Sequence, residues 1–207
     1  ESNKTIILPR NAAGIPTGLT CKGIVFHIID DFETFKSTND LNDSNLNGYQ
    51  EKHGLVVSTK KGNNFGTVAA ADIEQAFIDG NVEKYTDTET SNGYKLTQIL
   101  VGTENLGFIA LNNHTEKLNN STAWYAPSFN ELKYLIQGEN TQTGSTSGQE
   151  YINKQLKKIN ADELAGTIPS VTFYNGVGDH GLRLMTGGSE NGWHGIPGEA
   201  FYPICAF

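Results

Sequence analysis

The alternation of hydrophobic and polar positions divides the chain into short β-rich runs and amphipathic segments of helical period. The runs at 22–29 (KGIVFHII) and 53–59 (HGLVVST) are rich in β-branched residues, which is typical of strands. A polar stretch at 30–52 separates them, so we expect a hairpin that carries a long insertion. After Gly166 the pattern predicts only short strands and Gly-rich loops.

Apolar residues at helical spacing predict several helices. The segment 67–80 has one apolar side and ends at Gly80, a residue typical of helix C-termini. The segment 150–160 has a similar apolar side, and the short apolar segments 96–101 and 106–114 also read as helical. The two apolar sides consist of Ala69, Ile73, Ala76 and Phe77, and of Ile152, Leu156 and Ile159.

The run STAWYAPSFNELKYLI at 121–136 changes abruptly from a strand pattern to a helix pattern. Such a junction can be a catalytic elbow, or it can be only the place where a strand meets a helix. Ser128 followed three residues later by Glu131 is a capping box, in which each side chain accepts a hydrogen bond from a backbone N–H group at the helix start. The capping box and the aromatic pair Trp124–Tyr125 explain the run without chemistry, so we predict a structural hinge.

Composition and charge limit the function classes. The 207 residues carry a formal net charge of −8, and Arg10 and Arg183 are the only arginines, so a nucleic-acid partner is not expected. No apolar run approaches the roughly 20 residues of a membrane helix. The chain begins at Glu1 without a leader pattern, and we expect a mature or excised piece of a larger exported protein.

The organisation of the chain indicates one α+β domain at 22–207 after an entry segment at 1–21, because neither a repeat nor an internal linker is visible. The two cysteines, Cys21 and Cys205, lie near opposite ends and do not form a zinc-binding pattern.

Several motifs together resemble a bacterial family of C-type-lectin-like surface domains, which is related in fold to formylglycine-generating enzymes and variable receptor proteins. The best piece is W-Y-x-P-S-x-x-E-L, present here from Trp124 to Leu132; KGIVFHI, HGLVVS and the terminal YPICAF occur in the family order. The chain departs from the family at 202–207, where the two-arginine ending is missing, and at 171–176, where VTFYNG replaces Tyr-Trp-Ser-Ser.

The resemblance implies a C-type-lectin-like fold: small twisted antiparallel sheets flanked by two main helices, with the N-terminal and C-terminal strands paired. In that fold the cysteines of the first and last strands lie on neighbouring strands. The resemblance therefore implies a Cys21–Cys205 disulfide, which would stabilise by about 3–5 kcal/mol in loop-entropy terms. The alternative is two free thiols packed as small apolar residues.

A calcium loop is one alternative to a cofactor-free domain. DLNDSNLNGYQE places four oxygen-bearing residues at positions 1, 3, 5 and 12 of an EF-hand-like loop, namely Asp40, Asn42, Ser44 and Glu51. The usual glycine at position 6 is Asn45, however, and position 8 is the polar Asn47. A solvated insertion whose Asp and Asn side chains form turns explains the same residues. The calcium-binding triplets of sugar-binding C-type lectins are absent from the sequence.

Ligand binding is expected in the C-terminal loops, where aromatic, amide and charged side chains lie among glycines. The resemblance also places the family's ligands on this face. The candidate residues are Tyr174, Asn175, Asp179, His180, Arg183, Glu190, Asn191, Trp193 and His194. Either Trp193 anchors the ligand or it fills the small core under the loops. Arg183 stands between Leu182 and Leu184, so we expect it to face away from both, solvated or paired with an acid.

Catalysis is not expected. Thr146 occupies the nucleophile position of GSTSG, and the five histidines do not cluster in sequence; His27 and His53 are expected to be packed or strand-face residues. We therefore expect a surface-exposed, exported bacterial protein or lipoprotein that is not an enzyme and that adheres to a glycan or a surface protein. The alternatives are a structural terminal domain of a larger surface or pilus protein and, third, a formylglycine-generating-type enzyme.

Overall fold

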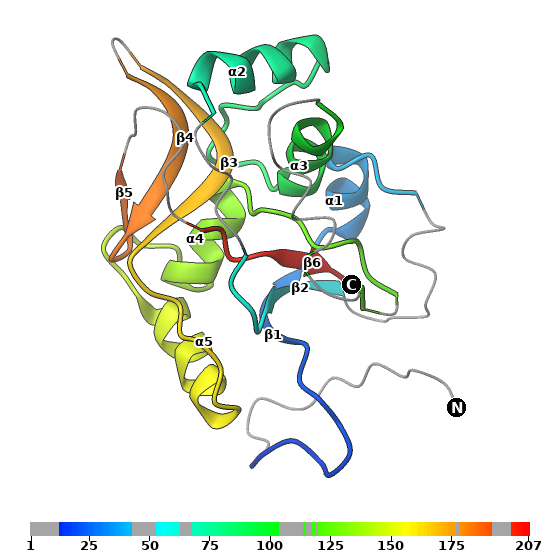
Figure 1. Ribbon diagram of the computed structural model, residues 1–207, viewed down its shortest axis with the longest axis vertical. Coiled ribbons are helices and arrows are strands. Elements are labelled where there is room, and N and C mark those ends of the chain that lie inside the picture. Colours follow the sequence, from blue (N-terminus) through cyan, green and yellow to red (C-terminus); the bar gives the residue numbers. More distant parts are fainter. Residues whose placement is uncertain are drawn as a thin grey trace.

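The computed structural model describes residues 13–42, 53–62, 68–103, 114, 117–118, 120–176, 179–191 and 200–207. Within these ranges the protein is a mixed α/β fold of five helices and two three-stranded antiparallel sheets (Figure 1). Small antiparallel sheets with flanking helices were predicted and are confirmed. Two main helices were expected beside the sheets, and the described residues form five helices.

The first sheet has the strand order β1–β2–β6, with β1 at Gly23–Ile29, β2 at His53–Ser58 and β6 at Ile204–Ala206. β2 pairs antiparallel with both neighbours, as the sequence predicts for β1 and β2. The predicted pairing of the N-terminal strand with the C-terminal strand is wrong, because β2 lies between them.

Both edges of β6 are occupied, which explains why this short strand does not reach β1. On one side it pairs with β2. On the other side Tyr125 and Ile204 exchange two backbone hydrogen bonds of 2.8 Å, and the Thr122 N–H group donates to the Ala206 carbonyl at 2.8 Å. The segment before the hinge therefore serves as the outer neighbour of β6.

The second sheet has the order β3–β4–β5, with β3 at Thr167–Gly176, β4 at Asp179–Thr186 and β5 at Ser189–Asn191. β3 and β4 are longer than the short strands predicted for this region. Gly187 and Gly188, at φ +54° and +78°, form the tight turn between β4 and β5, where glycine adopts the left-handed conformation without a steric penalty.

Three helices begin and end near their predicted limits: α2 at Ala70–Asp79, α3 at Gly93–Gly102 and α5 at Ser147–Lys158. The fourth, α4 at Phe129–Gln137, is the capped helix. The helix α1 at Phe32–Thr38 was missed within the polar stretch; its first turn is held by Asp31, which accepts a 3.0 Å bond from Thr34 N–H. The segment predicted as helical at 106–114 lies, except for His114, outside the described residues.

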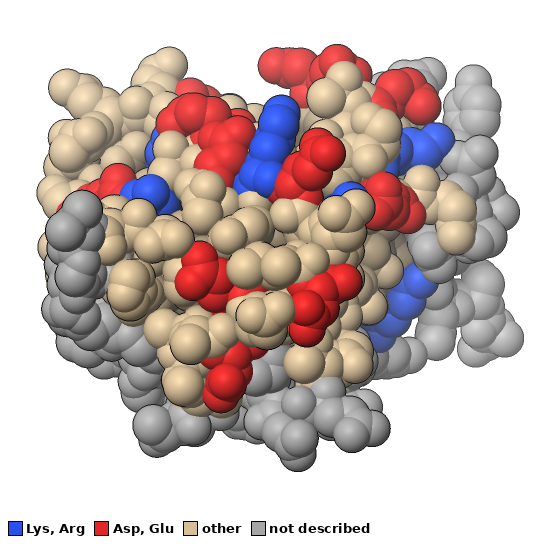
Figure 2. All heavy atoms as spheres, turned by 90° about the horizontal axis from the view of Figure 1, so that it is seen from above, with Lys and Arg blue, Asp and Glu red and all other residues tan. Residues whose placement is uncertain are grey.

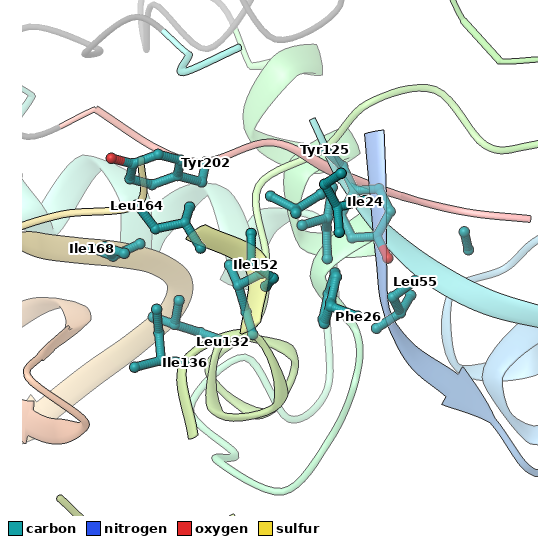
Figure 3. Packing of buried hydrophobic residues seen from close by; sticks show 14 of the residues in the cluster. Ile24, Phe26, Leu55, Tyr125, Leu132, Ile136, Ile152, Leu164, Ile168 and Tyr202 are labelled. Carbon is teal, nitrogen blue, oxygen red and sulfur yellow. The ribbon is translucent and has the colours of Figure 1, made fainter. Parts of the chain in front are cut away.

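The core has three clusters of buried side chains. The largest lies between the first sheet, α4 and α5, and also takes in Tyr125, Leu164, Ile168 and Tyr202 (Figure 3). The second lies between α2, α3 and the second sheet. The third is small and lies on the opposite side of the first sheet; it consists of Val56, Trp124, Cys205 and Phe207.

The β3–β4 hairpin is covered on both faces. Val171, Phe173 and Leu182 pack in the cluster with α2 and α3, whereas Ile168 and Met185 pack in the cluster with α4. The outer edge of β3 is also bonded: the Val171 N–H group donates to the Pro127 carbonyl and the Phe173 N–H group to the Tyr85 carbonyl, both at 2.8 Å. Helices α2 and α3 on one face and α4 on the other therefore hold the hairpin that carries the candidate site.

Cys21 and Cys205 are free thiols, so the structure does not support the expected disulfide. Cys21 is half-buried and packs against the largest cluster, whereas Cys205 belongs to the third cluster. The strands on which the bridge depended are not neighbours, because β2 separates them. The structure agrees with the alternative prediction of two free thiols that pack as small apolar residues.

Candidate functional site

The described candidate residues all lie on the second sheet, where they form two separate groups. Tyr174 and Asn175 lie near the end of β3, Asp179, His180 and Arg183 lie on β4, and Glu190 and Asn191 lie on β5. The antiparallel register places Asn175 opposite His180 and Tyr174 opposite Gly181. Trp193 and His194 lie outside the described residues, so the role predicted for Trp193 stays a prediction.

Arg183 is held between two aromatic rings. Its guanidinium carbon lies 4.9 Å from the centroid of the Tyr174 ring and 5.8 Å from that of Phe129, the first residue of α4. Lys133 lies over the same Phe129 ring at 5.8 Å. A guanidinium attracts and stacks on aromatic faces, so the two rings fix the arginine between the hairpin and α4.

Glu190 pairs with this arginine: its Oε1 atom accepts a hydrogen bond from Arg183 Nη1. Glu190 stands opposite Met185, two residues beyond Arg183, and the two side chains are therefore diagonal cross-strand neighbours on one face. Arg183 was expected to turn away from its flanking leucines and to be either solvated or paired with an acid, and the ion pair matches the second alternative. Burial lowers the pKa of Arg183, because desolvation disfavours the charged guanidinium.

Arg183 nevertheless retains an unused donor. Its Nε atom is buried and has no hydrogen-bond partner in the described structure. The side chain is 15% exposed, whereas that of Glu190 is 41% exposed. The arrangement is therefore a recessed cation with one carboxylate on its solvent side.

A second polar group faces α2. The Asn175 amide donates to Glu74 Oε1 at 2.9 Å, and His180 Nδ1 lies 3.3 Å from Asn175 Oδ1. The Tyr85 hydroxyl reaches the same Glu74 oxygen at 3.5 Å. Burial and the neighbouring Glu74 carboxylate raise the pKa of Tyr85. Glu74 therefore ties α2 to the end of β3, and sequence reasoning missed it because the contact joins residues 101 positions apart.

The surface at the α2 end of the molecule carries more acidic than basic side chains (Figure 2). Asp72 and Asp79 on α2 and Glu83 just beyond it are exposed. Acidic side chains repel a polyanion but are compatible with neutral or singly charged ligands.

The calcium hypothesis is only partly covered by the described residues. Asp40 lies at φ +52° and its carboxylate pairs with Lys95 Nζ at 2.9 Å. Asn42 is described, whereas Ser44 and Glu51 lie outside the described residues. Within the described part of the chain, no group of three or more His, Cys, Asp or Glu side chains is placed to hold a metal ion.

The capping box and the buried aromatic pair predicted at the hinge are both present. Ser128 and Glu131 form the capping box of α4, and Trp124 and Tyr125 are 3% and 0% exposed. Glu131 is fully buried, and its carboxylate accepts bonds from Ser128 N–H at 2.7 Å, from the Tyr125 hydroxyl at 3.1 Å and from Gly93 N–H. Desolvation raises the pKa of Glu131 to about 7, although these hydrogen bonds act in the opposite direction.

The two strand histidines are packed residues, as expected. His27 stacks on Tyr134 of α4 with ring centroids 3.8 Å apart, and its Nδ1 atom lies 2.9 Å from Glu139 Oε2. The register shift between Val25 and His27 is a bulge in β1 that turns His27 toward α4. His53 stacks on Phe32 at 3.4 Å.

His114 forms a pair that sequence reasoning missed. Its Nε2 atom lies 2.9 Å from the hydroxyl of Ser58, a distance typical of a nucleophile and its base. Ser58 is only 3% exposed, however, and its Oγ also accepts a 3.1 Å bond from Lys60 N–H. The pair therefore connects His114 to the buried last residue of β2. Burial lowers the pKa of His114.

Comparison with known proteins gives one structural relative. No protein-family model and no curated protein matches the chain. The structure is similar to the crystal structure of a fimbrial protein from Bacteroides ovatus ATCC 8483, with a TM-score of 0.59 and 18% sequence identity. The similarity covers 95% of this chain but only 45% of that chain. This chain thus shares the fold of part of a longer fimbrial protein, and the finer assignment to the C-type-lectin-like fold stays a prediction.

None of the helices in the described part of the chain has the length and apolar character needed to span a membrane.

Proposed function

We propose that the chain is a structural domain of a larger bacterial surface or pilus protein, exported to the cell surface. The observation that carries this proposal is the fold shared with the Bacteroides ovatus fimbrial protein over 95% of this chain. That relative is more than twice as long as the matched part, which supports a chain that works as one unit among others. This favours the structural role over adhesion as the main function.

A non-enzymatic role is part of the same proposal. The Ser58–His114 pair is closed to a substrate because Ser58 is buried. Formylglycine-generating enzymes, as the resemblance implies, need two cysteines at one copper site. Here Cys21 and Cys205 lie in different clusters, and burial raises the pKa of Cys205 to about 12, which keeps its thiol protonated. These features support a domain without catalytic chemistry.

Adhesion to a glycan or a protein is the second candidate function, and one observation favours it. The recessed Arg183 between Tyr174 and Phe129, with Glu190 on its solvent side, combines aromatic and charged groups at the surface. Such combinations of aromatic and hydrogen-bonding groups are typical of ligand sites.

Immunogold labelling of the source bacterium tests the surface role. An antibody raised against this chain should label intact cells, on the envelope or along filaments, at the density seen after permeabilisation. An antibody to an abundant cytoplasmic protein, which should label only permeabilised cells, is the control. Labelling confined to permeabilised cells would exclude the proposed location. A glycan array with the isolated chain tests the second candidate separately.

A further inference from the structure

The hydrogen bonding of Arg183 is incomplete in a way that needs an explanation. A guanidinium has five N–H donors in a planar fork, and buried donors in native proteins are nearly always paired. Here Nη1 pairs with Glu190, while the buried Nε has no partner in the described structure. Glu190 therefore satisfies the outer part of the guanidinium and leaves its inner donor unused.

The surroundings of this guanidinium strengthen its interaction with a bound carboxylate. The Tyr174 and Phe129 rings lie 4.9 and 5.8 Å from the guanidinium carbon, and the arginine side chain is only 15% exposed. In such a low-dielectric site a charge-assisted hydrogen bond is stronger than in water. The rings also hold the planar fork in one orientation, so that little side-chain freedom is lost when an anion binds.

We propose that Arg183 is a binding site for the carboxylate of a terminal sugar acid, and that Glu190 occupies this place in the unliganded protein. The internal pair shows that a carboxylate fits at the guanidinium. Glu190 is the more exposed partner, at 41% against 15%, so it can turn into solvent while Arg183 stays between its rings. This inference goes beyond the assembly role and does not depend on it.

The chemistry around the site favours a sugar acid over an acidic peptide. Once displaced, the Glu190 carboxylate can accept hydrogen bonds from sugar hydroxyls, and the Tyr174 ring and hydroxyl lie beside the guanidinium. The net charge of −8 and the acidic side chains at the α2 end disfavour a partner with many adjacent negative charges. A single carboxylate on an otherwise neutral sugar avoids that repulsion.

The test follows the Arg183 Nε–H signal by nitrogen-15 NMR during titration with glucuronate. The chain has two arginines, so two such signals are expected, and Arg183→Lys identifies one by removing it. We expect a saturable shift of that signal with glucuronate and none with glucose. Calorimetry should show that Arg183→Lys, which keeps the charge but loses the fork, weakens binding at least about tenfold.

Glu190→Gln separates this proposal from a purely structural ion pair. Removing the internal competitor should tighten glucuronate binding by about tenfold if the pair is closed roughly 90% of the time. Glu163→Gln, which breaks the Lys157–Glu163 pair on the surface, should leave the affinity unchanged. No shift in either the natural chain or Glu190→Gln at 50 mM glucuronate overturns the proposal. Equal affinity for glucuronate and for N-acetylglutamate amide overturns the choice of a sugar acid.

Discussion

The carboxylate of Glu131 lies where a side chain on Gly93 would have to be. A Cβ atom built on Gly93 would stand 2.2 Å from Glu131 Oε2, 2.5 Å from Ser128 N and 2.8 Å from the Ala126 carbonyl oxygen. Gly93 is the first residue of α3, and Glu131 lies in the first turn of α4. Two helix starts therefore meet at one buried carboxylate, and the absence of a side chain at Gly93 makes that meeting possible.

Gly93→Ala should destabilise the fold by about 1–3 kcal/mol, because two of the three close atoms belong to the backbone and cannot move aside cheaply. Gly102→Ala is the matched control at the other end of α3, where a Cβ would meet nothing within 4 Å. There the helix propensity of alanine should leave stability equal or raise it by up to about 1 kcal/mol. Urea unfolding of both variants measures the difference, and similar losses in the two would refute the steric argument.

Glu131 should make stability fall as the pH rises from about 4.5 to about 7. In the unfolded chain the carboxyl loses its proton near the usual 4.5, whereas in the folded protein its pKa is about 7. Between these values the folded state binds more protons than the unfolded state, so unfolding becomes easier with rising pH. The full effect, on the order of 3 kcal/mol, is reached above pH 7.

The variant Glu131→Gln isolates this effect, because an amide keeps an oxygen for the Ser128 and Gly93 N–H groups and offers a donor to Tyr125. We expect the free energy of unfolding of Glu131→Gln, measured from pH 4 to 8, to increase relative to that of the natural chain as the pH rises. Glu83→Gln, at an exposed position, should follow the natural chain throughout. The same pH slope in Glu131→Gln and the natural chain would show that the carboxyl titrates normally in the fold.

Local features of this structure were predictable and long-range ones were not. The capping box depends on Ser128 and Glu131, three residues apart, and was predicted correctly. The contact of Glu131 with Gly93 joins two helices and leaves no periodic signal. The prediction that the first and last strands pair was wrong for the same reason, since no local sequence signal indicates that β2 lies between β1 and β6. The seven-residue α1 was missed because it is too short to show a full helical period.

The candidate site shows the same division. The alternation Leu182–Arg183–Leu184 predicted that the arginine points away from its neighbours and is either solvated or paired with an acid, and the structure shows the pair with Glu190. Stacking on Phe129 was not predictable, because it depends on how α4 packs against the hairpin.

Thr172 on β3 accepts a hydrogen bond from the first turn of α4, and we expect its replacement to lower the stability of the fold. Its hydroxyl accepts a 2.8 Å hydrogen bond from the N–H group of Phe129, a first-turn donor that has no partner within the helix. Thr172→Val keeps the shape but leaves this buried donor unsatisfied, so we expect a loss of about 1–3 kcal/mol. Thr172→Ser keeps the hydroxyl and should lose less than the valine variant. Chemical denaturation of the pair provides the comparison, and a valine variant as stable as the serine variant would mean that the bond adds nothing.

The two thiols should differ sharply in reactivity. Cys21 is half-buried, whereas Cys205 is completely buried, with a pKa raised to about 12 by desolvation. Because the thiolate is the reactive form, an alkylating reagent at pH 8 should modify Cys21 slowly in the folded protein and leave Cys205 unmodified. Burial also raises the pKa of Cys21, so its reaction should be slower than that of a free thiol.

Intact mass spectrometry of the folded, unreduced protein measures this, with the unfolded protein as the control in which both thiols react. One added group in the folded state and two in denaturant are expected. If the denatured but unreduced protein takes up no reagent and reduction then adds two groups, the cysteines are bridged after all. Such a result would require the segment that precedes β1 to approach β6, although β2 lies between β1 and β6 in this structure.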